Sequence, residues 1–289
     1  MHRPLKDAGP APAPHVEGRV ATTTLRRPGE GDSTDLVALE EPLEIRLAGE
    51  RVGLLMRTPG DDHRLALGWL FSEGILASAS GISAVYHCGR PGDEGHGNTI
   101  DVAPSSGAVI DWARVDAARR DAPAGSACGV CGRSAVEDLV AGLVPPDPIP
   151  PLPAALVAER VAALGDHQPI FAATGATHVA ALWTHGGALI AAHEDVGRHN
   201  AVDKVLGALL VARAADATAP APALLTVSSG AGVEVVQTAA RARIPIVATV
   251  SAPTSLAVSL ARAAGLTLAG FVRGGRMNVY AGAERLEGI

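Results

Sequence analysis

The chain has 289 residues, enough for two domains, and 47% of them are hydrophobic, which supports a well-buried core. A formal net charge of −6 argues against a general nucleic-acid or membrane-surface binder. Three cysteines are unlike the set of a disulfide-stapled secreted domain, and no run of about 20 apolar residues could cross a bilayer. We therefore expect a reduced, cytoplasmic protein that binds neither nucleic acid nor membrane.

The first half of the chain reads as a tail followed by a small domain. Residues 1–18 are rich in Pro, Ala and Gly and lack the apolar stretch of a secretory signal, so they are predicted to be a disordered tail. Residues 20–120 are predicted to form an α+β domain. Its expected elements are strands within 36–47 and at 52–57, 82–88 and 99–103, with a helix at 63–73.

The second half reads as a connector followed by an α/β domain. Residues 121–152 contain a Cys-x-x-Cys loop and a proline-rich run, which is a stiff connector. Residues 153–289 alternate between helix and strand, which predicts a largely parallel α/β layer. The expected helices are 154–164, 198–214, 233–242 and 255–264, and the expected strands are 178–183, 188–192, 223–227, 246–250 and 266–272.

The pair Cys128 and Cys131 is the first candidate for chemistry. Glycines at 129 and 132 let the backbone turn tightly, and amide N–H groups or Arg133 would favour the thiolate. Such a pair can hold a metal, cycle as a disulfide or carry sulfur. A zinc site would need two histidines, because no second Cys-x-x-Cys exists. The available ones are His178, His185, His193 and His199.

A second candidate is the segment 193–204, in which seven of the twelve residues are ionisable. It lies between a predicted strand and an apolar-striped helix. Acidic residues suit a helix start, but that role does not explain His, Arg and Asn packed together. We interpret the segment as an additional functional site. Its candidate residues are Glu194, Asp195, Arg198, His199 and Asn200.

Two loops resemble anion sites. The loop 227–232 follows a buried strand and opens a helix, where free N–H groups bind anions. The loop 251–255 repeats this arrangement after the next strand, at the edge where α/β proteins bind ligands. A nucleotide or pterin phosphate is therefore plausible, with Ser229, Gly230, Ser251 and Thr254 as candidate contacts.

The last candidate is the loop 271–276, which follows the final predicted core strand. Two arginines flank two glycines, so the loop is either a hairpin turn with solvated arginines or a basic grip for phosphates or guanine. In the second case Phe271 offers a stacking face. The residues are Phe271, Val272, Arg273, Gly274, Gly275 and Arg276.

Taken together, these segments resemble the formate dehydrogenase accessory sulfurtransferase family (FdhD/NarQ). The resemblance covers residues 36–280. One departure is that Ala231 and Gly232 stand where the family pattern has Arg and a hydroxyl residue, which leaves that loop only its backbone donors. The matching pieces are 71–75, 128–132, 194–201, 251–254 and 271–280.

The resemblance implies both a fold and a function. The fold is α/β, with a cytidine-deaminase-like C-terminal domain, a smaller N-terminal α+β domain and a homodimeric assembly. The function is to pass persulfide sulfur from a cysteine desulfurase to the molybdenum bis(molybdopterin guanine dinucleotide) cofactor, as formate dehydrogenase requires. Cys128 would carry the persulfide, Cys131 would assist, the loop 271–276 would bind the cofactor, and no permanently bound metal is expected.

Two other functions stay open at this point. A zinc-dependent deaminase-like enzyme needs His-x-Glu or Cys-x-Glu and Pro-Cys-x-x-Cys. Here His193-Glu194 lacks the spacer, and no proline directly precedes Cys128. A non-catalytic chaperone that holds and delivers the cofactor would use the same pocket as a sulfurtransferase.

Overall fold

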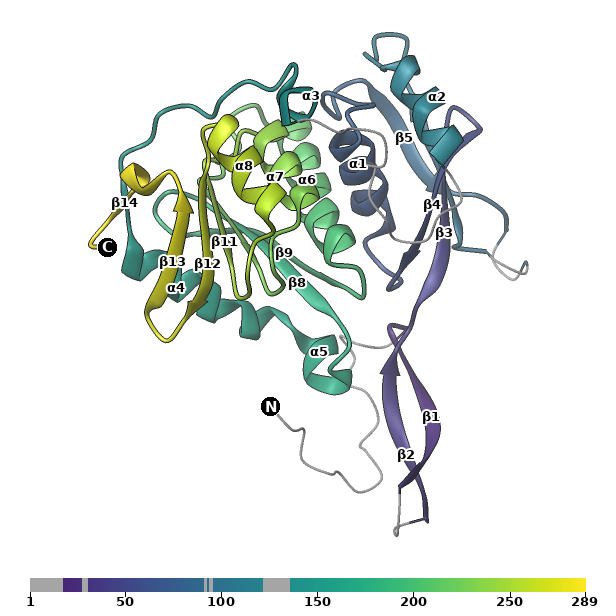
Figure 1. Ribbon diagram of the computed structural model, residues 1–289. Helices are drawn as coiled ribbons and strands as arrows, with labels where there is room; N and C mark the ends of the chain where they lie inside the picture. Colours follow the sequence, from purple (N-terminus) through teal and green to yellow (C-terminus); the bar gives the residue numbers. More distant parts are fainter. Residues whose placement is uncertain (1–17, 28–30, 91–92, 94–95, 122–135) are drawn as a thin grey trace.

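The computed structural model describes residues 18–27, 31–90, 93, 96–121 and 136–289. Within them, a six-stranded and a four-stranded sheet lie on either side of a group of helices, and a two-stranded arm projects from the body (Figure 1). The first elements are β1 (Val20–Arg27), β2 (Gly31–Ala38), β3 (Glu41–Leu47), β4 (Glu50–Arg57), α1 (Asp62–Ser72), β5 (Ile82–His87), β6 (Thr99–Pro104), α2 (Trp112–Asp121) and α3 (Val136–Val140). The remaining ones are β7 (Leu152–Pro153), α4 (Ala154–Ala162), η2 (Ala163–His167), α5 (Pro169–Thr174), β8 (His178–Trp183), β9 (Leu189–Asp195), α6 (Arg198–Ala215), β10 (Leu224–Val227), α7 (Val233–Arg241), β11 (Ile246–Thr249), α8 (Ser255–Ala263), β12 (Thr267–Arg273), β13 (Arg276–Ala281), η3 (Ala283–Arg285) and β14 (Leu286–Glu287).

The six-stranded sheet is mixed, with the order β13-β12-β11-β10-β8-β9. The neighbours β10, β11 and β12 are parallel, as the alternation of strand and helix predicted. The prediction of a largely parallel layer is wrong for the other pairings, which are antiparallel. For β8–β9 and β12–β13 the reason is local, because tight glycine turns join these strands and reverse the chain instead of crossing over.

Each face of this sheet has its own apolar layer. In β8, Ala180 and Leu182 pack towards α6, α7 and α8, whereas Val179, Ala181 and Trp183 pack towards α4. Successive strand residues point to opposite faces, so a nearly continuous apolar strand serves both layers. Figure 1 shows α6, α7 and α8 on one side of the sheet and α4 on the other.

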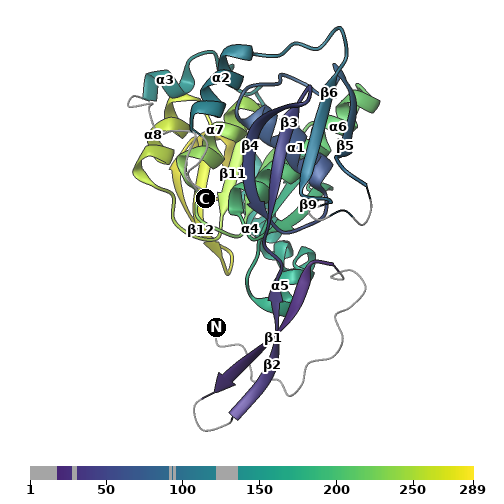
Figure 2. The same ribbon diagram turned by 90° about the vertical axis from the view of Figure 1, so that its right-hand side faces the viewer.

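The four-stranded sheet has the order β4-β3-β6-β5 and is covered by α1. Its alternating residues Leu43, Ile45 and Leu47 are fully buried, as their pattern predicted. Figure 2 shows the strands in front and α1 behind them. Helix α2 lies within residues 105–124, where the sequence pattern is too weak to predict an element, and helix α5 was not predicted either.

The arm is an antiparallel ribbon of β1 and β2, paired from Val20–Ala38 to Arg27–Gly31. It extends away from both sheets in Figures 1 and 2, and its second strand contacts α5. The sequence did not predict this hairpin, because a ribbon exposed on both faces lacks the apolar alternation that marks a half-buried strand.

The two sheets share one hydrophobic core, because α1 packs directly on α6. A Cβ atom on Gly68 would overlap the backbone of Asp203, and a Cβ on Gly207 would overlap the backbone of Arg64. The helix backbones can approach this closely only because both positions are glycine. The resulting apolar cluster joins residues of the four-stranded sheet, such as Ile45, to residues of the six-stranded sheet.

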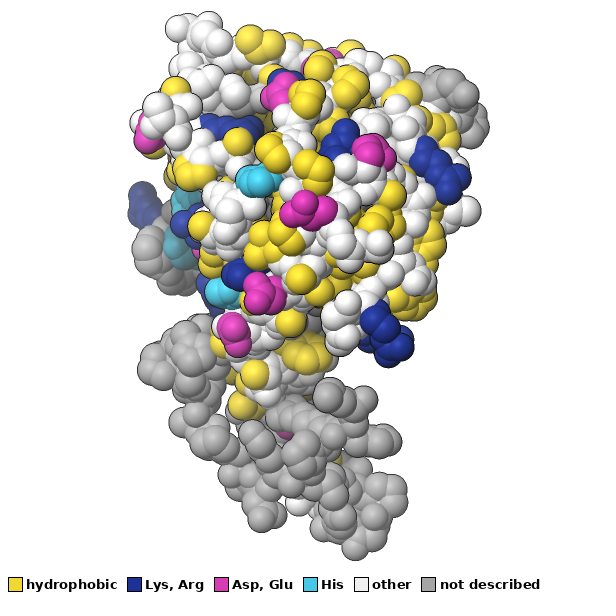
Figure 3. Space-filling view, turned by 90° about the vertical axis from the view of Figure 1, so that its left-hand side faces the viewer, with side chains coloured by type: hydrophobic (Ala, Val, Ile, Leu, Met, Phe, Trp, Pro, Cys, Tyr) yellow, Lys and Arg dark blue, Asp and Glu magenta, His cyan; other side chains and the backbone are white. Residues whose placement is uncertain are grey.

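Charged side chains are sparse on the surface, in agreement with the modest net charge. On the face shown in Figure 3, Lys and Arg side chains of the described residues stand apart among apolar and neutral groups. No helix within the described ranges is both long and apolar enough to cross a membrane.

We predict that Gly207→Ala destabilises the chain, although alanine is the better helix former. The added methyl group would force α1 away from α6, and overpacking of this kind costs roughly 1–3 kcal/mol or more. Urea unfolding measures the change. Gly165→Ala is the control, because nothing lies within 4 Å of a Cβ there. Equal unfolding midpoints for the two variants would contradict the close crossing.

The same helix contact buries the carboxyl group of Asp203, which accepts a 2.6 Å hydrogen bond from the Ser72 hydroxyl. Burial raises the pKa of Asp203 from 3.8 to about 8, against the opposing effect of the Ser72 bond. The folded chain therefore holds a proton that the unfolded chain releases above pH 3.8. Its contribution to stability is complete below that pH and is lost as the pH rises to about 8.

We predict that Asp203→Asn becomes progressively more stable than the parent chain as pH rises from 5 to 8. The amide keeps an acceptor for Ser72 but does not ionise, so the difference grows by about 1.4 kcal/mol per pH unit and then levels off. Thermal unfolding across this pH range is the measurement. A difference that does not change with pH would refute the raised pKa.

Candidate functional site

The ionisable segment folds around a buried ion pair at the turn from β9 into α6. Asp195 is fully buried, and its Oδ2 lies 2.7 Å from the Nζ of Lys204, which is 1% exposed. Lys204 also donates to the carbonyl oxygens of Thr58 (3.0 Å) and Glu194 (3.3 Å), so all three of its N–H groups are used. The pair ties the connection between β4 and α1 to the six-stranded sheet.

Asn200 completes this network. Its side-chain amide donates to the Met56 carbonyl (2.8 Å) and to Asp195 Oδ1 (2.9 Å), while the Gly197 N–H donates to the same Oδ1 (2.9 Å). A buried carboxylate with this many donors is a fixed part of the structure and offers little to a ligand. The geometry therefore gives Asp195 and Asn200 structural roles.

Glu194 also has its carboxylate turned inwards. It accepts hydrogen bonds from the backbone N–H groups of Ile170 (2.8 Å) and Phe171 (2.9 Å) and from the Thr177 hydroxyl (2.7 Å). These N–H groups open helix α5, so Glu194 satisfies donors that a short helix leaves free. Of the five predicted residues, Arg198 and His199 keep side chains at the surface.

The two predicted anion loops lie side by side at the carboxyl ends of β10 and β11. The Ser251 N–H donates to the Ser229 carbonyl (3.3 Å), and the Thr254 N–H donates to the Ala231 carbonyl (2.9 Å). Gly230 has no room for a side chain, because a Cβ there would overlap the Ala252 carbonyl. Thr254 caps α8 by accepting from the Ala257 N–H (3.2 Å).

The third loop joins this row at Phe271, whose N–H donates to the Ser251 carbonyl (3.2 Å). Phe271 has a φ of 53°, in the left-handed region that non-glycine residues rarely adopt, and 38% of its surface is exposed. Strain of this kind concentrates at functional sites. The next residue, Val272, is 1% exposed, so only its backbone is available to a ligand.

The tip of the β12–β13 hairpin carries two arginines directly opposite each other. Gly274 and Gly275 have φ values of 57° and 73°, as a two-residue hairpin turn requires. Arg273 pairs with Arg276 in the strand register, and both are exposed. Like charges in this position repel, and no carboxylate among the described residues neutralises them. The tip is therefore suited to an anion.

Cys128 and Cys131 lie outside the described residues. The described helices nearest to them in sequence are α2, which ends at Asp121, and α3, which begins at Val136. In Figures 1 and 2 both helices lie at the upper end of the molecule, whereas the β12–β13 turn lies at the lower end of the six-stranded sheet.

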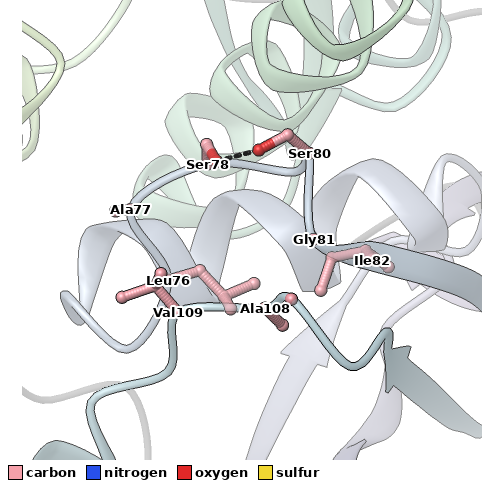
Figure 4. A pocket seen from close by; sticks show the side chains of 9 residues that line it. Leu76, Ala77, Ser78, Ser80, Gly81, Ile82, Ala108 and Val109 are labelled. Atoms are coloured by element: carbon pink, nitrogen blue, oxygen red, sulfur yellow. Dashed lines mark hydrogen bonds between the residues drawn. The ribbon is translucent and has the colours of Figure 1, made fainter.

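Neither a metal centre nor a deep pocket adds to these loops within the described residues. Among the described residues, no group of three or more His, Cys, Asp or Glu side chains is arranged to hold a metal ion. A shallow pocket of about 150 Å³ lies between the loops 76–82 and 107–109 (Figure 4). Small and apolar residues line it, and its only drawn hydrogen bond joins Ser78 to Ser80. It contains none of the predicted site residues.

The hydrogen-bond partners of the segment 193–204 could not be predicted from the sequence. Met56 lies in β4 and Thr58 directly follows that strand. They are 144 and 138 residues away from their partners Asn200 and Val196, so no local pattern could link them. Glu234 and His178, which lie near His199, were also not identified as a group. The available signal was that His178 begins a strand and that Glu234 is the second residue of a helix next to the loop 227–232.

The fold and these loops define a mixed α/β protein with a polar, anion-suited sheet edge. The model of the FdhD/NarQ family matches residues 38–287, and the chain belongs to this family.

Relatives match over nearly the whole chain. A "Sulfur carrier protein FdhD" from Anaeromyxobacter dehalogenans is 54% identical over 99% of this chain and 98% of its own length. One with the same name from Mycobacterium tuberculosis is 42% identical over 87% of this chain and 92% of its own. The crystal structure of a candidate formate dehydrogenase accessory protein from Desulfotalea psychrophila has a TM-score of 0.69 and 28% identity, and it covers 92% of this chain and 98% of that one.

We predict that Lys204→Met lowers the free energy of unfolding by roughly 3–5 kcal/mol, because the Asp195 carboxylate would stay buried without its cation. Chemical denaturation measures the loss. Arg51→Met is the matched control, since Arg51 is half exposed beside Glu44 and such pairs contribute under about 1 kcal/mol. Similar losses for both variants would show that Asp195–Lys204 does not hold this turn.

Proposed function

We propose that this chain carries sulfur from a cysteine desulfurase to the molybdenum bis(molybdopterin guanine dinucleotide) cofactor, as an accessory to formate dehydrogenase. The general function, carrying sulfur, is supported by a relative that is named a sulfur carrier protein and is 54% identical over 99% of this chain. The observation that supports this cofactor as the sulfur acceptor is the strained, exposed Phe271 close in sequence to Arg273 and Arg276, which are paired opposite each other and have no carboxylate partner among the described residues. An aromatic face and two guanidinium groups are the chemistry that recognises a guanine with its phosphates.

The sulfur chemistry is assigned to Cys128 and Cys131. The Cys128 thiolate attacks the terminal sulfur of the desulfurase persulfide, and the desulfurase cysteine leaves as a thiol after taking a proton. The Cys131 thiolate then attacks the inner sulfur of the Cys128 persulfide. A Cys128–Cys131 disulfide forms, and hydrosulfide leaves with the electron pair of the broken S–S bond and passes to the bound cofactor. A cellular dithiol later reduces the disulfide. This sequence makes the chain a sulfurtransferase.

The proposal also covers the cellular location, the oligomeric state, the partners and the fold. We place the chain in the cytoplasm, as a homodimer, with a desulfurase and formate dehydrogenase as its partners. The C-terminal domain is proposed to be cytidine-deaminase-like, with no permanently bound metal. Helices on both faces of a mixed sheet and loops at one sheet edge are compatible with that fold.

A cofactor-binding chaperone without sulfur transfer is the second candidate. It is favoured by Phe271, Arg273 and Arg276 at the β12–β13 turn, because these residues belong to cofactor binding and not to the sulfur chemistry. A protein that only holds the cofactor would need the basic tip and Phe271 but not the two cysteines.

We predict that the full chain gains one sulfur atom when incubated with a cysteine desulfurase and cysteine. Intact-mass spectrometry detects the gain, which dithiothreitol removes. Cys128→Ala should abolish it, and Cys131→Ala should keep the persulfide but release no hydrosulfide, because the attacking thiolate is missing. Cys88→Ala is the control, since Cys88 lies at the end of β5 outside the pair. Cofactor binding without any sulfur gain would favour the chaperone.

A further inference from the structure

The hairpin of β12 and β13 contains two β-bulges, one on each strand. On β13, Tyr280 is an extra residue, because neighbouring residues of β12 pair with Ala281 and Val279. The second bulge follows Gly270 on β12 and includes Phe271, whose φ is 53°. Bulges re-aim side chains and are frequent next to functional sites. Both aromatic side chains of this hairpin therefore stand at a bulge.

Gly270 pairs with Asn278 between the two bulges. A Cβ on Gly270 would lie 2.9 Å from Pro253 Cδ and 3.1 Å from the Ser251 carbonyl oxygen. Tyr280 Cε2 also lies 3.1 Å from this point. Because glycine leaves the point empty, the Tyr280 ring lies against the β12 backbone, beside the loop that follows β11.

The Asn278 side chain lies on the same face of the sheet as the Tyr280 ring. Its neighbours Met277 and Val279 pack in the layer towards α4, so alternation along the strand directs Asn278 to the opposite face. Its Nδ2 donates a long hydrogen bond of 3.5 Å to the Tyr280 hydroxyl. Asn278 is exposed, and its amide oxygen accepts no hydrogen bond from any described residue. The amide thus offers both an acceptor and a second donor to a ligand.

Helix α8 holds the Tyr280 bulge in place. The Arg262 guanidinium donates to the Tyr280 carbonyl oxygen from both Nε (3.2 Å) and Nη2 (3.1 Å). A bulge leaves backbone groups without their partners in the ladder, and these two bonds satisfy one of them. The Tyr280 hydroxyl is therefore a fixed partner for the Asn278 amide.

We propose that Asn278 binds the polar edge of the guanine base of the cofactor and that Tyr280 is the positioning residue that holds its amide. The inference rests on the proposed function, in which Phe271 and the two arginines recognise a guanine with its phosphates. A side-chain amide presents a donor beside an acceptor. Guanine presents the acceptor O6 beside the donor N1–H, so two hydrogen bonds form.

The spacing along β13 suits a nucleotide. Arg276 and Asn278 are two residues apart on one strand, which separates their backbones by about 7 Å. Asn278 is also paired with Gly270, the residue before Phe271. A ligand whose base and phosphates are separated by a ribose can therefore reach the amide and the guanidinium group at the same time.

Isothermal titration calorimetry with the full chain compares GDP with pyrophosphate, which lacks the base. In Asn278→Ala the affinity for GDP should fall roughly 3-fold to 30-fold, because two hydrogen bonds to the base are lost, while pyrophosphate binds as before. In Tyr280→Phe the amide loses its partner, so GDP affinity should fall by roughly 2-fold to 3-fold, again without effect on pyrophosphate. Tyr86→Phe is the control, because that hydroxyl bonds to Asp101 in the four-stranded sheet, and it should change neither affinity.

A second variant, Asn278→Asp, tests which edge of the base is bound. A carboxylate only accepts hydrogen bonds. Guanine offers it two adjacent donors, N1–H and N2–H, whereas adenine has an acceptor at N1. The ratio of GDP affinity to ADP affinity should therefore rise at least about 3-fold over that of the parent chain. A ratio that stays constant or falls overturns the contact with the base.

The outcomes separate this inference from the proposed function. GDP affinity that Asn278→Ala leaves unchanged, or lowers together with pyrophosphate affinity, overturns the role of Asn278, and the proposed cofactor site stands. GDP affinity that is unchanged in Tyr280→Phe overturns the positioning role alone. Absence of GDP binding in the parent chain and in every variant overturns the base contact and the proposed cofactor site together.

Discussion

The packing of α1 on α6 is the contact on which the rest of this structure depends. Two glycines, Gly68 and Gly207, let the helix backbones approach without intervening side chains. Across this contact the four-stranded and six-stranded sheets bury one common apolar cluster. The domain boundaries expected from the sequence stay a prediction, but the described parts of both proposed domains are packed into one body.

The same contact concentrates buried polar groups where the two halves meet. Asp203 keeps its proton there because desolvation outweighs its hydrogen bond to Ser72. Lys204, the next residue, turns to the other side and joins Asp195 to the Thr58 carbonyl. The segment 193–204, interpreted as an additional functional site because of its charge density, therefore mostly holds distant parts of the chain together.

The polar groups that remain available to a ligand lie at the carboxyl ends of β10, β11 and β12 in the six-stranded sheet. Backbone hydrogen bonds align the loops after β10, β11 and β12, and each loop contributes a different group. The first offers a helix start with Glu234 in its first turn, the second a capped helix, and the third a strained phenylalanine with two opposed arginines. Three neighbouring loops that each contribute a different group suit a long anionic ligand better than a small substrate.

The sequence by itself determined the strands and helices with a clear apolar period, the turn glycines of the last hairpin, and the family to which the chain belongs. These features are local, because periodicity and turn geometry depend on residues close in sequence. The tertiary structure decided which ionisable residues are available. Glu194, Asp195 and Asn200 are buried against partners outside their own segment, whereas Arg198 stays exposed and His199 Nε2 lies 3.5 Å from Glu234 Oε2. Burial and pairing depend on contacts between distant segments, which no local pattern records.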